Sequence, residues 1–315
     1  MFLVVTILLI IILILVLALY CKKTAGQCEN SKHLVGKVVI VTGGSSGIGF
    51  EAAMDLAQRG ARVIVANRNQ KNGTDARAKI IAGSGNNDVY YYSLDLTSFK
   101  SVRKFANNVL CTEERLDVLI NNAGMMNGEH KVTEDGLVAE IQANYFGPFL
   151  LTNLLLPLLM KTPKSRIVNV SSVVYKLGRI DLDDLNLHSK SWITKYFTYA
   201  TTKLYIMLMT VELDRRLRGS GVTVNVVHPG YVATNILIKD GSVLKKIGLK
   251  MFGDFVKTAR MGAQTIIYLA VSPEVTDVSG CYFEDCKLVK LNRKANDMDV
   301  ARKLWDKSLQ LVHLE

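Results

Sequence analysis

The chain has 315 residues, enough for one large α/β domain or two small ones, and 49% of them are hydrophobic against 21% charged. This balance supports a sizeable buried core and excludes a disordered chain. The net charge of +11 would suit nucleic acid, an anionic membrane surface or a phosphorylated ligand, but the cations are scattered and not interleaved with aromatic residues, so nucleic acid is not expected. The five cysteines include no CxxC pair and no matching histidine cluster, so no metal site is expected either.

The first segment is an apolar run that begins at Phe2 and ends at Tyr20. It contains no charged residue and is long enough to cross a bilayer core as a helix. A cleaved signal peptide is the alternative, but no basic region precedes the run, which is too long, and no A-x-A site follows. Lys22 and Lys23 follow at once, so the positive-inside rule places the remaining chain in the cytosol. We therefore predict a membrane anchor and linker over residues 1–35, in the endoplasmic reticulum membrane.

From Gly36 onward, short apolar runs alternate with longer segments of helical periodicity. Nearly continuous apolar runs are typical of parallel strands that are buried on both faces. The alternation predicts a doubly wound parallel sheet of the Rossmann type, with ligands at the carboxyl ends of the strands. No linker rich in Pro, Gly or Ser divides residues 36–315, so we expect a single α/β domain there. The predicted strands are 37–42, 62–67, 89–93, 118–121, 165–170 and 223–228, and the predicted helices are 50–59, 74–82, 98–109, 136–160 and 199–218.

The first predicted strand runs directly into a glycine-rich loop, TGGSSGIG, and then into a helix. Glycine lets the chain turn tightly and lets a pyrophosphate approach the free N–H groups at the helix N-terminus. The spacing departs from G-x-G-x-x-G, and glycine clusters also occur in plain surface loops. The position between a strand and a helix nevertheless indicates a dinucleotide site. Its candidate residues are Gly43, Ser45, Ser46, Gly47, Ile48 and Gly49.

The second predicted strand ends in Asn67 and Arg68. NAD-binding proteins usually offer a carboxylate to the ribose 2′-hydroxyl here, whereas an arginine accommodates a 2′-phosphate. Asn67 has no charge to repel that phosphate, and Arg68 supplies a forked cation suited to it. A solvated arginine at a strand end is the alternative. The pair favours NADP(H) as the cofactor.

Tyr199 and Lys203 lie four residues apart in a predicted helix and therefore share a face. An unperturbed tyrosine has a pKa of about 10, and a neighbouring ammonium would lower it toward the range useful for proton transfer. The YxxxK pattern is common by chance. However, NNAG and NVSS end the fourth and fifth predicted strands, where the reactive ring of a bound dinucleotide would lie. Ser172 would there donate a hydrogen bond to a substrate oxygen as charge develops on it.

The motifs TGGSSGIG, NNAG, VSS, YATTK and HPG occur in this order over residues 36–235, and together they resemble the short-chain dehydrogenase/reductase family. The resemblance implies that Tyr199 is the general acid/base and that Lys203 lowers its pKa and holds the nicotinamide ribose. It also implies that Ser172, as the second serine of its motif, orients the carbonyl, and that Asn144 supports a proton-relay water. The implied cofactor contacts are Asp95 with the adenine, Leu96, Asn122, Ala123 and Gly124 along the cleft, Tyr199 and Lys203, and Pro229, Gly230 and Thr234 over the nicotinamide.

The interval between Ser172 and Tyr199 is longer than in most of that family. With the anchor and the segments LLTNLLL, LGRI, GCYF and RKLW, the chain is similar to the membrane-bound retinol dehydrogenase branch. This implies an NADP(H)-dependent enzyme that interconverts an apolar, lipid-like aldehyde or ketone and its alcohol, such as retinal and retinol. Sterol, polyprenol and fatty-aldehyde substrates stay open, as does a homodimer. A catalytically silent NADP-binding membrane scaffold is the alternative of another class, but none of the four catalytic residues is lost.

The segment from Leu237 to Arg260 mixes apolar residues with lysines and one arginine. It follows Thr234 and is expected to cover the active-site cleft. One interpretation is a helix packed on the core with a solvated basic face. The other is an amphipathic segment in the membrane interface, with its cations toward anionic headgroups.

Overall fold

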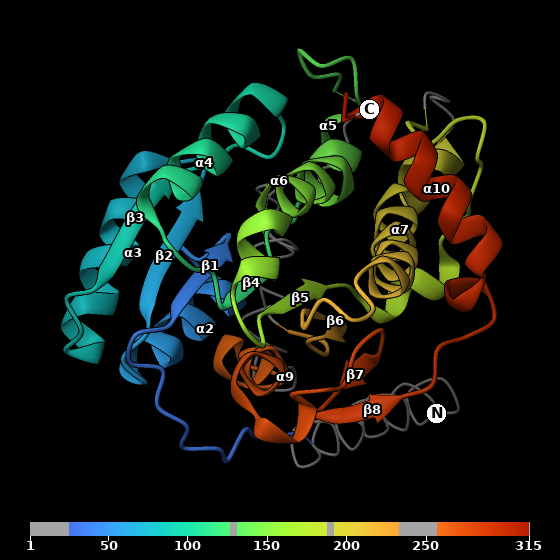
Figure 1. The fold of residues 1–315 in the computed structure, drawn as a ribbon. Coiled ribbons are helices and arrows are strands. Elements are labelled where there is room, and N and C mark those ends of the chain that lie inside the picture. The colour runs from blue at the N-terminus through green and yellow to red at the C-terminus, as the bar shows by residue number, and fades with distance from the viewer. Residues whose placement is uncertain (1–24, 127–130, 188–191, 233–256, 315) are drawn as a thin grey trace, which may run out of the picture.

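The computed structural model describes residues 25–126, 131–187, 192–232 and 257–314. Within these ranges the elements form a single α/β domain around one sheet (Figure 1). The predicted anchor between Phe2 and Tyr20, the predicted contact at Thr234 and most of the segment from Leu237 to Arg260 lie outside the described residues.

The sheet has eight strands in the order β3-β2-β1-β4-β5-β6-β7-β8. All neighbouring strands pair in parallel except β8, which runs antiparallel to β7. The prediction of a doubly wound sheet is confirmed, and each predicted strand matches within one residue. The pattern did not predict β7 and β8, because a three-residue strand is too short to show a period. The strands are β1 Val38–Thr42, β2 Arg62–Asn67, β3 Val89–Ser93, β4 Val118–Asn121, β5 Arg166–Val170, β6 Thr223–His228, β7 Tyr282–Glu284 and β8 Lys287–Val289.

Helices cover both faces of the sheet, as Figure 1 shows with α4, α6, α7 and α10 above it and α2 and α9 below it. Alternate residues of β1 serve the two cores, since Val38 and Ile40 pack on the first face and Val39 and Val41 on the second. The helices are α2 Gly47–Gln58, α3 Gln70–Ser84, α4 Phe99–Thr112, α5 Ala139–Ile141, α6 Gly147–Lys161, α7 Trp192–Arg216, α9 Ala259–Val271 and α10 Met298–Leu311, with 3-10 turns η2 Val173–Leu177, η5 Pro273–Val275 and η6 Lys294–Asn296.

The helix predicted over 136–160 contains a π-helical turn, η1 Gln142–Phe146, between α5 and α6. Such turns insert one residue into the helix and often mark functional sites. The continuous stretch Ala139–Lys161 is long and apolar enough to cross a membrane, but 72% of its most apolar part is buried. It is therefore a core helix of this domain.

Helix α7 starts at Trp192, two turns before the predicted start at Tyr199. Its buried apolar residues from Leu204 to Leu213 belong to the core, and the helix contacts α10 and η2. Tyr199 and Lys203 consequently lie inside a long helix, where their spacing is held firmly.

Candidate active site

The glycine-rich loop joins the end of β1 to the start of α2 at the carboxyl edge of the sheet. Gly43 and Gly47 have φ values of +66° and +57°, which a side chain would strain. A Cβ atom on Gly49 would lie 2.4 Å from Nδ2 of Asn122. Glycine at position 49 therefore allows the loop after β4 to pack directly against the start of α2.

Asn122 holds these two loops together, because its side-chain amide donates to the Thr42 carbonyl at 2.9 Å. The Thr42 hydroxyl is buried and accepts from the backbone N–H groups of Asn122 and Ala123, at 3.0 Å each. It also donates to the Ile120 carbonyl at 3.2 Å. The sequence analysis missed Thr42, although its place as the last residue of the strand before the glycine loop was a usable signal.

We expect Thr42→Val to lower the free energy of unfolding by about 2–4 kcal/mol, because two buried N–H donors lose their acceptor while the side-chain volume stays the same. Urea denaturation of the detergent-solubilised chain measures this loss. Thr42→Ser, which keeps the hydroxyl, is the matched control and should recover most of it. If Thr42→Val lost as little free energy of unfolding as Thr42→Ser, the Thr42 hydroxyl would not be what holds the two loops together.

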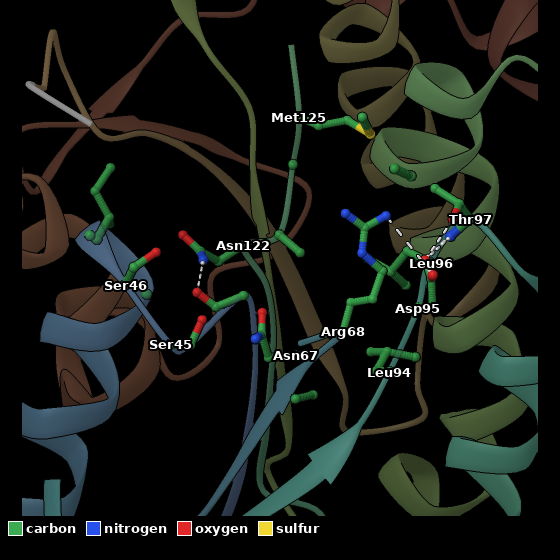
Figure 2. Close-up of a pocket in the computed structure, with 18 residues that line it drawn as sticks. Ser45, Ser46, Asn67, Arg68, Leu94, Asp95, Leu96, Thr97, Asn122 and Met125 are labelled. Carbon is green, nitrogen blue, oxygen red and sulfur yellow. Dashed lines mark hydrogen bonds and ion pairs between the residues drawn. The ribbon is translucent and has the colours of Figure 1, made fainter. Parts of the chain in front are cut away.

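A single cleft opens above the glycine loop and runs along the carboxyl ends of the first four strands (Figure 2). Every cofactor-binding residue predicted on these strands lines it, from Gly43 to Gly124. The cleft has further lining residues that the motifs did not indicate, namely Ala66, Leu94, Thr97, Met125 and Ala143.

Arg68 reaches across the cleft toward Asp95, as Figure 2 shows, and its guanidinium lies 4.0 Å from the Asp95 carboxylate. The carboxylate is oriented by the N–H of Thr97 at 2.9 Å and its hydroxyl at 2.6 Å. The Arg68 side chain is 62% exposed. An exposed, long ion pair of this kind is weak, so the guanidinium can turn to a phosphate without a large cost.

Lys203 of α7 lies next to Gly124, which lines the cleft, and Tyr199 of the same helix lies beside Lys203. Lys203 is buried, and its ammonium donates to the Val170 carbonyl at 2.9 Å and lies 5.4 Å from the centre of the Tyr199 ring. A Cβ atom on Gly124 would stand 3.7 Å from this ammonium and 3.4 Å from Oδ1 of Asn144. Glycine at 124 thus leaves open the space in which an extended dinucleotide would reach the reactive pair, and the cleft fits such a cofactor.

Asn144 lies in the π-helical turn and is completely buried. Its amide donates to the Met125 carbonyl at 2.8 Å and to the Thr202 hydroxyl at 3.2 Å, and its oxygen accepts from the Met125 N–H at 2.7 Å. Asn144 therefore ties α7 and the loop after β4 to the turn. The π-helical geometry of its position could not be seen in the sequence.

The structure distinguishes the two serines after β5. The Ser171 hydroxyl is buried and donates to the Lys203 carbonyl at 2.9 Å. Ser172 is only half-buried and its hydroxyl makes a long contact of 3.5 Å with the Val174 N–H. Only Ser172 therefore has a hydroxyl free to turn toward a substrate.

The pKa values of Tyr199 and Lys203 differ from the expectation. Burial raises the pKa of Tyr199 to about 12, and the nearby Glu140 carboxylate adds to this rise. Burial also lowers the pKa of Lys203 to about 8, against a smaller opposing effect of Glu140. The predicted lowering of the tyrosine pKa is thus wrong for this structure, because the cost of burying a phenolate is the largest effect on this group. Glu140 was missed, although an acidic residue in an apolar helix was a visible signal.

Pro229 and Gly230 directly follow β6, at the carboxyl edge of the sheet. A Cβ on Gly230, whose φ is +87°, would press on the side chain of Lys257. Lys257 is buried and paired with Asp285. An ion pair inside the fold satisfies the charge of Lys257, so this lysine does not belong to the basic face that either interpretation of the segment from Leu237 to Arg260 describes.

Residues 37–183 match the family model described as short chain dehydrogenase. The chain is 45% identical to retinol dehydrogenase 13 of Homo sapiens, over 93% of this chain and 89% of that protein, and 46% identical to human retinol dehydrogenase 14, over 89% and 87%. An uncharacterised protein from Mycobacterium paratuberculosis superposes with a TM-score of 0.73 at 34% identity, over 90% of this chain and 95% of that chain. A short chain dehydrogenase from Escherichia coli CFT073, complexed with NADPH, does so with a TM-score of 0.64 at 25% identity, over 82% and 100%.

Proposed function

The chain belongs to the short chain dehydrogenase family and is an oxidoreductase acting on CH–OH groups, and from this premise we propose that it uses NADP(H) to interconvert retinal-like aldehydes and their alcohols. The observation that carries this proposal is that Gly124, which lines the cleft together with Arg68, stands next to the Lys203 ammonium. Relatives named retinol dehydrogenase support the substrate class.

The cofactor preference is argued from the end of β2. Asn67 and Arg68 line the cleft, and no carboxylate stands at either position to repel a 2′-phosphate. Asp95 is the acidic residue among those that line the cleft. Its carboxylate is held by Thr97 and lies 4.0 Å from the Arg68 guanidinium. The NADPH complex of the Escherichia coli protein supports the same choice.

In the proposed reaction a bound nicotinamide would supply a hydride to the carbonyl carbon during reduction, or accept one from the alcohol carbon during oxidation. Tyr199 gives its phenolic proton to the carbonyl oxygen during reduction and takes it back during oxidation. Ser172 donates a hydrogen bond to the same oxygen, and Lys203 keeps a positive charge beside the phenol. In the cytosol, where NADP(H) is largely reduced, the net direction is reduction.

The test of this function is an assay of the purified full chain against retinoids, sterols, polyprenols and fatty aldehydes, each with NADPH and NADH. We expect the highest kcat/KM for retinal with NADPH. If a sterol or a fatty aldehyde gave the highest kcat/KM instead, the proposed retinal-like substrate class would be wrong. Cofactor binding without turnover on any of these compounds would instead support the silent scaffold, which the retention of Asn144, Ser172, Tyr199 and Lys203 opposes.

The cofactor assignment predicts that Asn67→Asp with Arg68→Ala lowers the preference for NADPH over NADH by about 100-fold. The new carboxylate would repel the 2′-phosphate and would bind the ribose hydroxyl of NADH. The ratio of kcat/KM for the two cofactors measures the change. Arg302→Ala is the matched control, because it also removes an exposed arginine that stands 4.0 Å from an aspartate, here Asp299 on α10. Unchanged selectivity in the double variant would mean that the 2′-phosphate binds elsewhere.

We further propose that the apolar run from Phe2 to Tyr20 anchors the enzyme in the endoplasmic reticulum membrane with its catalytic domain in the cytosol. Membrane attachment suits the proposed substrates, because they partition into lipid. The segment from Leu237 to Arg260 would add an interfacial contact beside the cleft.

A further inference from the structure

The linker after the anchor is bound to one side of the domain. A Cβ atom on Gly26 would lie 2.1 Å from the Asp285 carbonyl oxygen, so the two backbones are in direct contact. The Cys28 N–H donates to Gln264 of α9 at 3.0 Å. Figure 1 shows the blue linker passing below α9 to the β7–β8 hairpin.

This attachment limits the distance between the hairpin and the membrane. Only residues 21–25 separate Tyr20 from Gly26, and a fully extended chain of that length covers about 20 Å. If the apolar run spans the bilayer, as proposed above, the turn at Asp285 stays within that distance of its surface.

The free edge of the sheet at this place is basic and partly apolar. Leu288 of β8 is 63% exposed, an unusual fraction for a leucine. Around it Lys287, Lys290 and Arg293 are exposed, and in the described part of the chain none of these three cations pairs with a carboxylate. We call these four residues the edge surface.

Lysines on an edge strand also prevent pairing with other chains, so their presence alone does not distinguish a binding surface from such protection. The opposite edge of the sheet provides the comparison. There β3, with the sequence VYYYS, is equally terminal in the strand order but carries no cation. Protection against pairing would apply to both edges, whereas only β8 carries a lysine in the edge strand itself; the lysines beside β3, Lys100 and Lys104, lie on α4.

We propose that the edge surface docks on anionic lipid headgroups and so fixes how the catalytic domain faces the bilayer. Lys287, Lys290 and Arg293 are attracted by the headgroups, and Leu288 enters the interface. The anchor already holds the domain at the membrane, so three cations suffice because docking is intramolecular. The inference rests on the proposed anchoring.

Docking here also orients the cleft. Strand β7 runs parallel to β6, so the turn at Asp285 lies at the carboxyl edge of the sheet, where the cleft opens. Tyr231, which is 66% exposed, is linked to the same turn through Lys257: its carbonyl accepts from the N–H of Lys257, whose side chain pairs with Asp285. The substrate end of the cleft would thus face the lipid that carries the substrate.

The test is amide hydrogen exchange of the full chain in nanodiscs of phosphatidylcholine, with or without about one-third phosphatidylserine. We expect exchange over residues 287–294 to be about tenfold slower in the anionic discs and the difference to vanish at high salt. Lys287→Glu with Lys290→Glu should abolish the difference. Lys100→Glu with Lys104→Glu is the matched control, because it makes the same charge change on exposed lysines of α4, and it should leave the difference intact.

Equal exchange in neutral and anionic discs would overturn the proposal that the edge surface docks on lipid. The same holds if the Lys287/Lys290 variant and the Lys100/Lys104 variant lose protection equally. Failure of the full chain to enter discs would overturn it together with the anchoring. Retinal turnover is measured in detergent on the same protein preparations, before they are placed in nanodiscs. Turnover without lipid-dependent protection leaves the proposed function standing, whereas protection without turnover supports the surface and counts against the function.

Discussion

Tyr199→Phe is expected to lower kcat by about 100-fold or more while leaving cofactor affinity unchanged. The substitution keeps the ring beneath the Lys203 ammonium, 5.4 Å away, and removes only the hydroxyl that carries the proton. Steady-state kinetics with NADPH and the best substrate measure the loss, and titration of the cofactor measures its dissociation constant.

Tyr205→Phe is the matched control for this loss. Tyr205 lies on the same helix and is fully buried, and its hydroxyl makes a 3.5 Å contact with the Leu185 carbonyl, away from the cleft. We expect its kcat to stay within a few-fold of the wild-type value. Near-normal turnover in the Tyr199→Phe protein would refute the catalytic assignment.

Lys203→Met is expected to reduce turnover by about 100-fold or more and also to change its pH dependence. The buried ammonium lies close to the ring that carries the phenol, so its removal leaves the phenolate even less stable than burial alone makes it. We expect the loss of alcohol oxidation to be largest below a pH of about 8, where the wild-type lysine is charged, and to shrink above it. Lys203→Arg, which keeps a charge, should lose less.

The direction of the pH dependence follows from the pKa values of the two groups. A tyrosine pKa of about 12 keeps the phenol protonated at neutral pH, so it is ready to donate in carbonyl reduction. Alcohol oxidation needs the phenolate and should therefore rise with pH. Above a pH of about 8, loss of the Lys203 charge should flatten this rise in the wild-type protein and not in Lys203→Met. An identical pH profile in both proteins would show that Lys203 acts only by binding the cofactor.

Much of the fold was predicted because its signals are local. Strands buried on both faces are nearly continuous in apolar residues, as the stretch VVIV in β1 and the stretch VIVA in β2 show. The glycine loop is local as well, since the positive φ angles of Gly43 and Gly47 restrict the residue type at those positions. The short strands β7 and β8 carried no such signal and were found only in the structure.

The sequence by itself determined which residues are available for chemistry, and only the tertiary structure decided which of them meet. The choice between Ser171 and Ser172 depended on a hydrogen bond to Lys203, some thirty positions along the chain. The effect of Glu140 on the pKa of Tyr199 and the contact between Gly26 and Asp285 likewise join residues that are far apart in the sequence. Periodicity reports which face of an element is buried, because that depends on residues three or four positions apart. Contacts between distant segments depend on how those faces pack, and burial then sets the pKa values that the local pattern misjudged.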